Sequence, residues 1–103
     1  MVINEKRKYK RIPFVKAIIY SASALKMDEL DEFFNDGVAV NVSEGGLGMI
    51  TDYPLKVGDI VTFKHEIKVK KIVASSSIVR WAREIETDRY RVGLEFFRRL
   101  RMI

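Results

Sequence analysis

Two arginines near the N-terminus, Arg7 and Arg11, have side chains suited to binding an anion. They lie four residues apart in a segment with five basic residues between positions 6 and 11 and one acid, Glu5. A guanidinium group bonds phosphate oxygens in a bidentate way, matches the O6/N7 edge of guanine and stacks on a base. We expect a flexible arm that folds over its ligand with both groups inward. A solvated basic tail is the alternative.

A second group of polar residues follows thirty positions later, as Asn41-x-Ser43 and the pair Gly45 and Gly46. The Asn41 amide can both donate and accept hydrogen bonds. Ser43 would project from the same face of an extended segment and could donate its hydroxyl to phosphate. The glycines permit close approach of the backbone and positive φ angles. The same residues are also those of a plain turn between strands.

Other groups that could carry chemistry are weaker. The chain has no cysteine and one histidine, His65, so a metal site would rest on carboxylates alone. The acids of residues 28–36 do not follow the spacing of a calcium-binding EF-hand loop and indicate a solvated face. No nucleophile–base order, phosphate loop or paired-carboxylate pattern is visible. We expect neither an enzyme nor a bound metal or cofactor.

Length and composition predict one compact domain. A chain of 103 residues with 48% hydrophobic residues can bury one core but not two. No apolar run is long enough to span a membrane, and the N-terminus lacks the apolar region of a signal peptide, so a cytoplasmic location is expected. The net charge of +5 is divided between a basic N-terminus and an acidic stretch at 28–36, which indicates an anion-seeking segment rather than a uniformly basic surface.

Most of the chain has the pattern of short β-strands. The clearest alternation is Val61, Phe63, Ile67 and Val69 against polar neighbours, which predicts a strand with one solvated face. Further strands are expected at 14–20, 38–42, 47–51, 72–81 and 90–96. Six short strands joined by tight turns favour closure, because an open sheet would leave exposed edges. We therefore predict an all-β, six-stranded antiparallel barrel.

Two segments fall outside the strand pattern. In residues 24–36 Leu30, Phe33 and Phe34 follow helical spacing, and Gly37 stands where a helix would end, so a short helix or a packed loop is expected. Residues 1–12 have no hydrophobic periodicity and are expected to form a flexible ligand-binding arm. Residues 13–103 then form the single barrel domain.

The two polar motifs, in this order, make the chain resemble PilZ domains, a family of bacterial receptors for cyclic di-GMP. The resemblance covers nearly the whole chain, since residues 55–59, 78–81 and 91–96 also look like recurring segments of the family. It implies the six-stranded barrel and a C-terminal helix, here truncated. It also implies ligand-binding roles for Arg7, Arg11, Asn41, Ser43 and Gly46.

Three weaker candidates accompany that set. Lys6 stands where the family often has another basic residue, which could help to hold a second, stacked ligand, although a solvated lysine fits equally well. Gly45 could lie close to the ligand. Trp81 could offer its ring to a guanine, as an aromatic residue does in some relatives, or could pack inside the barrel.

The expected function is that of a stand-alone cyclic di-GMP receptor. Ligand binding would order the arm and change the surface seen by an effector protein, with the chain a monomer or a ligand-linked dimer. One alternative is a basic barrel that binds RNA or single-stranded DNA, which the acidic residues of 28–36 and of the later strands disfavour. Another is a PilZ-like adaptor that works through protein contacts without the nucleotide.

Overall fold

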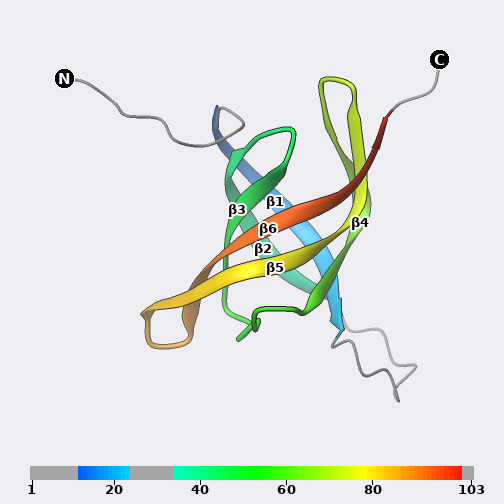
Figure 1. Ribbon diagram of the computed structural model, residues 1–103. Coiled ribbons are helices and arrows are strands. Elements are labelled where there is room, and N and C mark those ends of the chain that lie inside the picture. The colour runs from blue at the N-terminus through cyan, green and yellow to red at the C-terminus, as the bar shows by residue number, and fades with distance from the viewer. Residues whose placement is uncertain (1–11, 24–33, 101–103) are drawn as a thin grey trace.

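The computed structural model describes residues 12–23 and 34–100 and contains six strands in that part of the chain (Figure 1). The strands are β1 (Ile12–Ser23), β2 (Phe34–Val42), β3 (Gly46–Thr51), β4 (Ile60–Val69), β5 (Ile72–Glu86) and β6 (Arg89–Leu100). Each pairs antiparallel with its neighbours in the order β1-β2-β3-β6-β5-β4, and β4 pairs back to β1. The predicted closed antiparallel barrel is thus confirmed.

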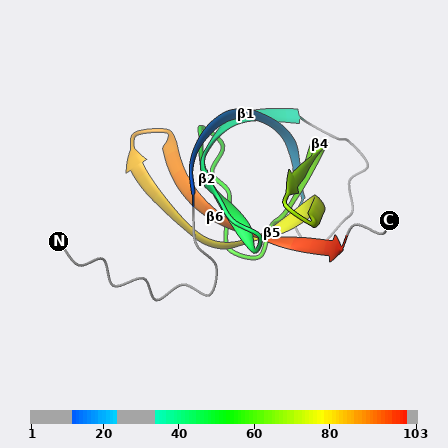
Figure 2. The same ribbon diagram turned by 90° about the horizontal axis from the view of Figure 1, so that it is seen from above.

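Closure follows from the alternation of the strands. In β4, Val61, Phe63 and Ile67 are buried while their neighbours are exposed, so one face of the strand fills the interior. The rings of Phe63 and Phe96 meet edge to face inside, with centroids 6.1 Å apart. Figure 2 looks along the barrel and shows the strands encircling this core. The most completely buried large side chains are Tyr20, Leu47, Met49, Leu94, Val61, Val79 and Val92.

The expectation for residues 24–36 was wrong at its C-terminal end. Residues 34–36 begin β2, with Phe34 paired to Ser21, and Gly37 lies within the strand opposite Ile18 instead of ending a helix. A Cβ at Gly37 would collide with the side chain of Met49, so the glycine makes room for a core residue. Residues 24–33 lie outside the described part of the chain.

The two ends of the barrel also differ from expectation. β6 continues to Leu100, so no C-terminal helix is found within residues 34–100. β1 begins at Ile12, one residue inside the segment assigned to the arm, and includes Pro13 beside an irregularity in its pairing with β2, a place where a strand tolerates proline. No helix that could cross a membrane occurs in the described residues.

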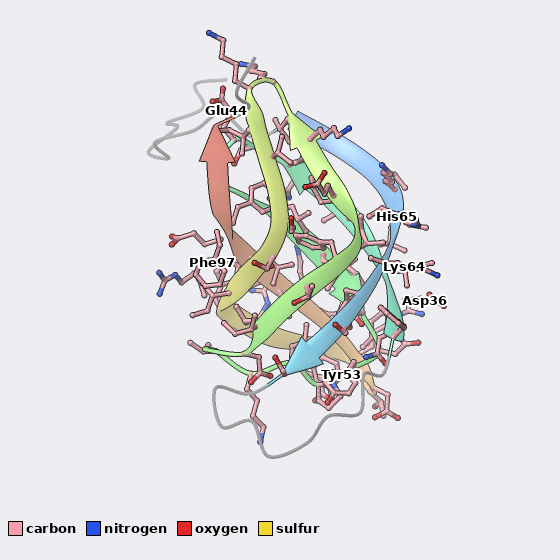
Figure 3. All side chains as sticks on the ribbon, turned by 90° about the vertical axis from the view of Figure 1, so that its right-hand side faces the viewer. Asp36, Glu44, Tyr53, Lys64, His65 and Phe97 are labelled. Carbon is pink, nitrogen blue, oxygen red and sulfur yellow. The ribbon has the colours of Figure 1, made fainter. Side chains whose placement is uncertain are left out.

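The outside of β1, β2 and β4 carries exposed polar and apolar side chains. His65 and Lys64 project from β4 into solvent, as Figure 3 shows. The Lys64 ammonium lies 5.7 Å from the centre of the Phe34 ring, a cation–π contact that spans β1. His65 has no second histidine or cysteine to join it in a metal site.

One buried polar contact ties β1 to β3. The hydroxyls of Tyr20 and Thr51 lie 2.6 Å apart, and Thr51 Oγ1 also donates to the Asp36 carbonyl at 3.3 Å and accepts from the Tyr53 N–H at 3.2 Å. Burial raises the pKa of Tyr20 above its ordinary value, although the hydrogen bond to Thr51 acts in the opposite direction. The folded barrel therefore holds the phenolic proton more tightly than the unfolded chain does.

This contact predicts a loss of stability in alkali. Tyr20 in the unfolded chain loses its proton at about pH 10, whereas the folded state keeps it, so its contribution is complete below pH 10 and is lost as pH rises through the folded-state pKa. Tyr20→Phe should flatten this decline in urea titrations between pH 9 and 11. At pH 7 it should cost about 1 kcal/mol. An unchanged alkaline profile would contradict the assignment.

Candidate ligand-binding site

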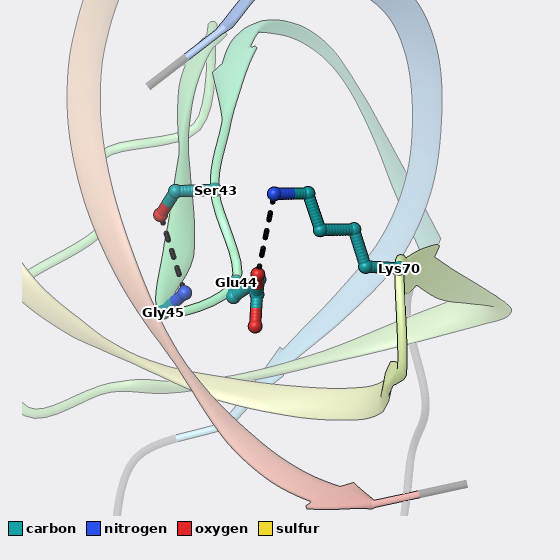
Figure 4. A network of polar contacts seen from close by, with 4 residues as sticks. All are labelled: Ser43, Glu44, Gly45 and Lys70. Atoms are coloured by element: carbon teal, nitrogen blue, oxygen red, sulfur yellow. Dashed lines mark hydrogen bonds and ion pairs between the residues drawn. The ribbon is translucent and has the colours of Figure 1, made fainter. Parts of the chain in front are cut away.

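The Asn41-x-Ser43-x-x-Gly46 segment forms the tight connection between β2 and β3 (Figure 4). The Ser43 N–H donates to the Gly46 carbonyl at 2.8 Å. The Ser43 hydroxyl accepts from the Gly45 N–H at 3.2 Å and donates to the Gly46 carbonyl over a longer 3.4 Å. Ser43 is 5% exposed. Its hydroxyl thus shapes the turn, and the turn interpretation of this motif describes the local structure well.

Position 46 requires a glycine because β3 and β6 lie very close together there. It pairs with Glu95 of β6, and a Cβ at this position would lie 1.9 Å from the carbonyl oxygen of Leu94. The Gly45 carbonyl accepts a hydrogen bond from the Phe96 N–H at 2.9 Å, also along the pairing of β3 with β6, which we call the β3–β6 seam. The second glycine therefore lets the turn pack directly against β6, which is a structural role.

Glu44, at the tip of the turn, meets a second hairpin. Its carboxylate lies 3.6 Å from the ammonium of Lys70, in the β4–β5 turn, as the dashed line in Figure 4 marks. Lys70 adopts a positive φ of 53° there. The pair is largely solvated and contributes little to stability, but it brings a cation that no sequence pattern singled out to the same end of the barrel as the turn.

Asn41 lies on the outer face of β2, against β3. It pairs with Gly48, whose N–H donates to Asn41 Oδ1 at 3.1 Å. A Cβ at Gly48 would lie only 3.0 Å from that oxygen, so the glycine allows the amide to lie across the neighbouring strand. This bond holds the amide in one orientation before any ligand arrives.

Trp81 lies on the outer face of β5 and not in the barrel interior. It pairs with Gly93 of β6, between the inward-facing Val92 and Leu94, and the indole covers the glycine so closely that a Cβ there would lie 2.0 Å from Nε1. The ring is 42% exposed. Gly93 thus makes room for the indole ring. Of the two positions weighed for Trp81, the structure has the surface one.

Strand pairing aligns these residues in one row. Asn41 pairs with Gly48, Gly48 with Gly93, and Gly93 with Trp81, across β2, β3, β6 and β5. We call these four residues the Asn41–Trp81 row. Its two central positions have no side chains, so the Asn41 amide lies over Gly48 and the Trp81 indole covers Gly93 on the outer sheet. The sequence feature that could have indicated this row is Gly48, a glycine inside a strand two positions after Gly46. It was not singled out from the sequence.

The N-terminal end of β1 continues the row. Pro13 pairs with Asn41 and Ile12 with Val42. Because Arg11 is bonded to Ile12, the basic segment joins the barrel directly beside the Asn41–Ser43 segment, and Arg7 is within roughly 17 Å of Ile12 along the chain. Lys6, Arg7 and Arg11 themselves lie outside the described residues. The structure thus places Ile12 and Pro13, the two residues that follow the basic segment, beside the Asn41–Ser43 segment.

The comparison with protein-family models matches the PilZ domain over residues 5–103. The chain belongs to the PilZ domain family. PilZ domains are binding domains of the cyclic di-GMP receptor family and are not catalytic. No curated protein matches this chain. In this PilZ domain the match spans both motifs and all six strands, so the barrel and the candidate site belong to one family unit.

Proposed function

We propose that this PilZ domain is a cytoplasmic receptor for cyclic di-GMP. The observation that carries the proposal is the pairing of Pro13 with Asn41, because it joins the basic arm to the barrel beside the Asn41–Trp81 row. Arg7 and Arg11 would neutralise the phosphates and contact guanine from the arm, while Asn41 would bond a guanine edge. Lys6 and Trp81 are candidates for further contacts, the first to phosphate and the second by stacking.

Ser43 would serve the ligand without dismantling its turn. The Gly46 carbonyl already accepts the Ser43 N–H at 2.8 Å, so the 3.4 Å bond from the hydroxyl is the weaker of the two. A rotation of the hydroxyl hydrogen toward a phosphate oxygen would leave the bond from the Gly45 N–H in place. Gly45 and Gly46 would contribute by letting the ligand and β6 approach the turn closely.

Calorimetric titration with cyclic di-GMP, and with GMP as the comparison, tests the proposal. The wild-type protein should show saturable heat with cyclic di-GMP, little with GMP, and a stoichiometry of one or two ligands per chain. Ser43→Ala should weaken binding about tenfold, or about 1.4 kcal/mol. Arg89→Ala, which removes an exposed arginine paired with Glu86 in the β5–β6 hairpin, is the control and should bind normally.

Two outcomes would contradict the proposal. A folded wild-type barrel that gives no heat with cyclic di-GMP is not its receptor, and protein contacts would then be the function to pursue. Binding that falls by several orders of magnitude between 50 and 200 mM salt, with equal affinity for single-stranded nucleic acid, would instead identify a polyanion binder.

Trp81 provides an independent optical test. It is the only tryptophan in the chain, so the indole emission reports on the Asn41–Trp81 row alone. Cyclic di-GMP should quench this emission, since a guanine stacked directly on the 42% exposed ring gives the excited indole a non-radiative route to the ground state. The quenching curve should give the calorimetric Kd. Calorimetric binding with unchanged emission would place the ligand away from Trp81.

Signalling would follow from the arm. Ligand contacts to Arg7 and Arg11 would order residues 1–11 against the barrel and present an effector protein with a surface that differs between the two states. Hydrogen exchange of residues 1–11 should slow on ligand addition. Exchange rates that stay the same in the saturated complex would show that the arm does not act as the switch.

A further inference from the structure

Strand β5 extends beyond its neighbour β4. The β4–β5 pairing ends where Ile60 meets Ile78, after which Val79 exchanges backbone hydrogen bonds of 2.9 Å with the loop at Gly58 and Asp59. β5 then continues to Glu86, paired on its other side with β6. Among the described residues nothing bonds the backbone of residues 80–86 on the β4 side. We call these seven residues the β5 edge.

The β5 edge is accessible. Figure 1 shows the β5–β6 hairpin projecting past the barrel. In the end-on view of Figure 2, β5 lies on the outer side of this hairpin. Trp81 and Ile85 are 42% and 40% exposed along it. Proline on an edge strand is one of the features that protect such an edge from pairing, and the β5 edge contains none. Its unpaired backbone groups can therefore accept another strand.

The charges along the edge decide which strand fits. When two copies of one strand pair antiparallel in a continuous sheet, the two-fold axis is perpendicular to the sheet, so one residue lies opposite itself. If the two-fold axis passes beside Arg83 or Glu84, that residue lies opposite its own copy and two like charges meet. If the axis passes beside Ile85, Glu84 of one copy lies opposite Glu86 of the other. Centring on Trp81 would need the backbone of Val79, which the loop already occupies.

Centring on Ala82 opposes no like charges and allows pairing over residues 80–84, after which the two strands separate, because Ile85 would otherwise lie opposite the occupied backbone of Val79. Trp81 of one copy then lies opposite Arg83 of the other, twice over, an arrangement that favours cation–π contact between exposed side chains. Glu84 lies opposite Arg80, the extra residue where the β5–β6 register shifts, and since the Arg80 guanidinium already pairs with Glu95 at 2.8 Å, this position only avoids a like-charge contact. Ala82, whose small side chain packs against the core, sits on the axis. The edge is thus complementary to itself in this register.

We propose that the β5 edge pairs with the same edge of a second copy of this chain, centred on Ala82, to form a weak dimer without ligand. The contact involves about five residues from each copy and is much smaller than a stable interface, so the dimer dissociates on dilution. The outer sheet, with one Asn41–Trp81 row from each copy, becomes continuous across the axis. This inference does not depend on nucleotide binding.

Disulfide trapping tests the register, because the natural chain has no cysteine. Under mild oxidation Ala82→Cys should cross-link to its own copy at least ten times faster than Glu86→Cys. In the proposed register the two residues at position 86 are roughly 27 Å apart. Equal rates for the two variants, or no cross-linking of a folded Ala82→Cys protein, would overturn the proposal.

Sedimentation of the ligand-free, full-length protein supplies a test that does not depend on the cysteine variant. The wild type should show reversible, concentration-dependent dimerisation. Arg83→Glu, which places a carboxylate opposite the Trp81 ring, should weaken it at least tenfold, while Arg83→Lys should retain most of it. A wild type that stays strictly monomeric up to about 1 mM, or a dimer insensitive to Arg83→Glu, would overturn the inference.

Discussion

Replacing both arginines of the arm, as Arg7→Ala with Arg11→Ala, is expected to weaken cyclic di-GMP binding at least about a hundredfold. Hydrogen bonds to charged groups contribute roughly 1.5–3 kcal/mol each, and each tenfold change in Kd corresponds to about 1.4 kcal/mol. In the proposed complex each arginine would contact a doubly charged ligand, and the residue after Arg11 joins the barrel beside Asn41. Calorimetry against the wild type at equal salt measures the loss.

The controls separate charge from geometry. Arg7→Lys with Arg11→Lys keeps both charges but loses the planar forks, so it should bind with intermediate affinity. Because neither position lies in the described barrel, the thermal unfolding of all three proteins without ligand should agree. A double alanine variant that binds as tightly as the wild type would show that the arm is not part of the site.

Gly46→Ala is expected to cost more stability than Gly37→Ala, although both add a single methyl group to a strand of the barrel. The new Cβ would lie 1.9 Å from the Leu94 carbonyl, and the obstacle is backbone that is itself paired to β3. Overpacking costs about 1–3 kcal/mol where side chains can move. Since β6 cannot move without breaking the seam, we expect a loss of about 3 kcal/mol or more. Urea unfolding measures it.

Gly37→Ala is the matched comparison, because it makes the same chemical change in a neighbouring strand. The atoms that it meets are the Met49 side chain, which is flexible and can adopt another rotamer. Its cost should therefore be clearly smaller than that of Gly46→Ala. If the two variants unfolded at the same urea concentration, the close approach of β3 and β6 would not be the source of the cost.

The strands could be predicted because their signal is local. Alternation in β4 and β6 depends only on neighbouring residues, and closure follows from the number of edges that must be paired. Residues 34–36 were assigned wrongly for the same reason. The helical spacing of Leu30, Phe33 and Phe34 is a local pattern, while the position of Phe34 in β2 is decided by pairing with β1.

The site was predictable in its residue types but not in its arrangement. The sequence shows that Asn41 and Ser43 are polar and that glycines follow them. It does not show the register, and the register alone puts Gly48, Gly93 and Trp81 in line with Asn41. Lys70 was missed because its partner Glu44 belongs to a different hairpin. Gly46 proved to be constrained by β6, which no local pattern reveals.

The seam between β3 and β6 also has a kinetic meaning. Asn41 and Gly48 belong to the β2–β3 hairpin, whereas Gly93 and Trp81 belong to the β5–β6 hairpin, and each hairpin forms from residues close in sequence. The two halves meet only through pairing between residues that lie from 39 (Thr51 and Tyr90) to 49 (Gly46 and Glu95) positions apart, a non-local step of the kind that slows folding. No isolated hairpin contains the whole row, so a nucleotide that needs all of it can recognise only a chain that has finished folding.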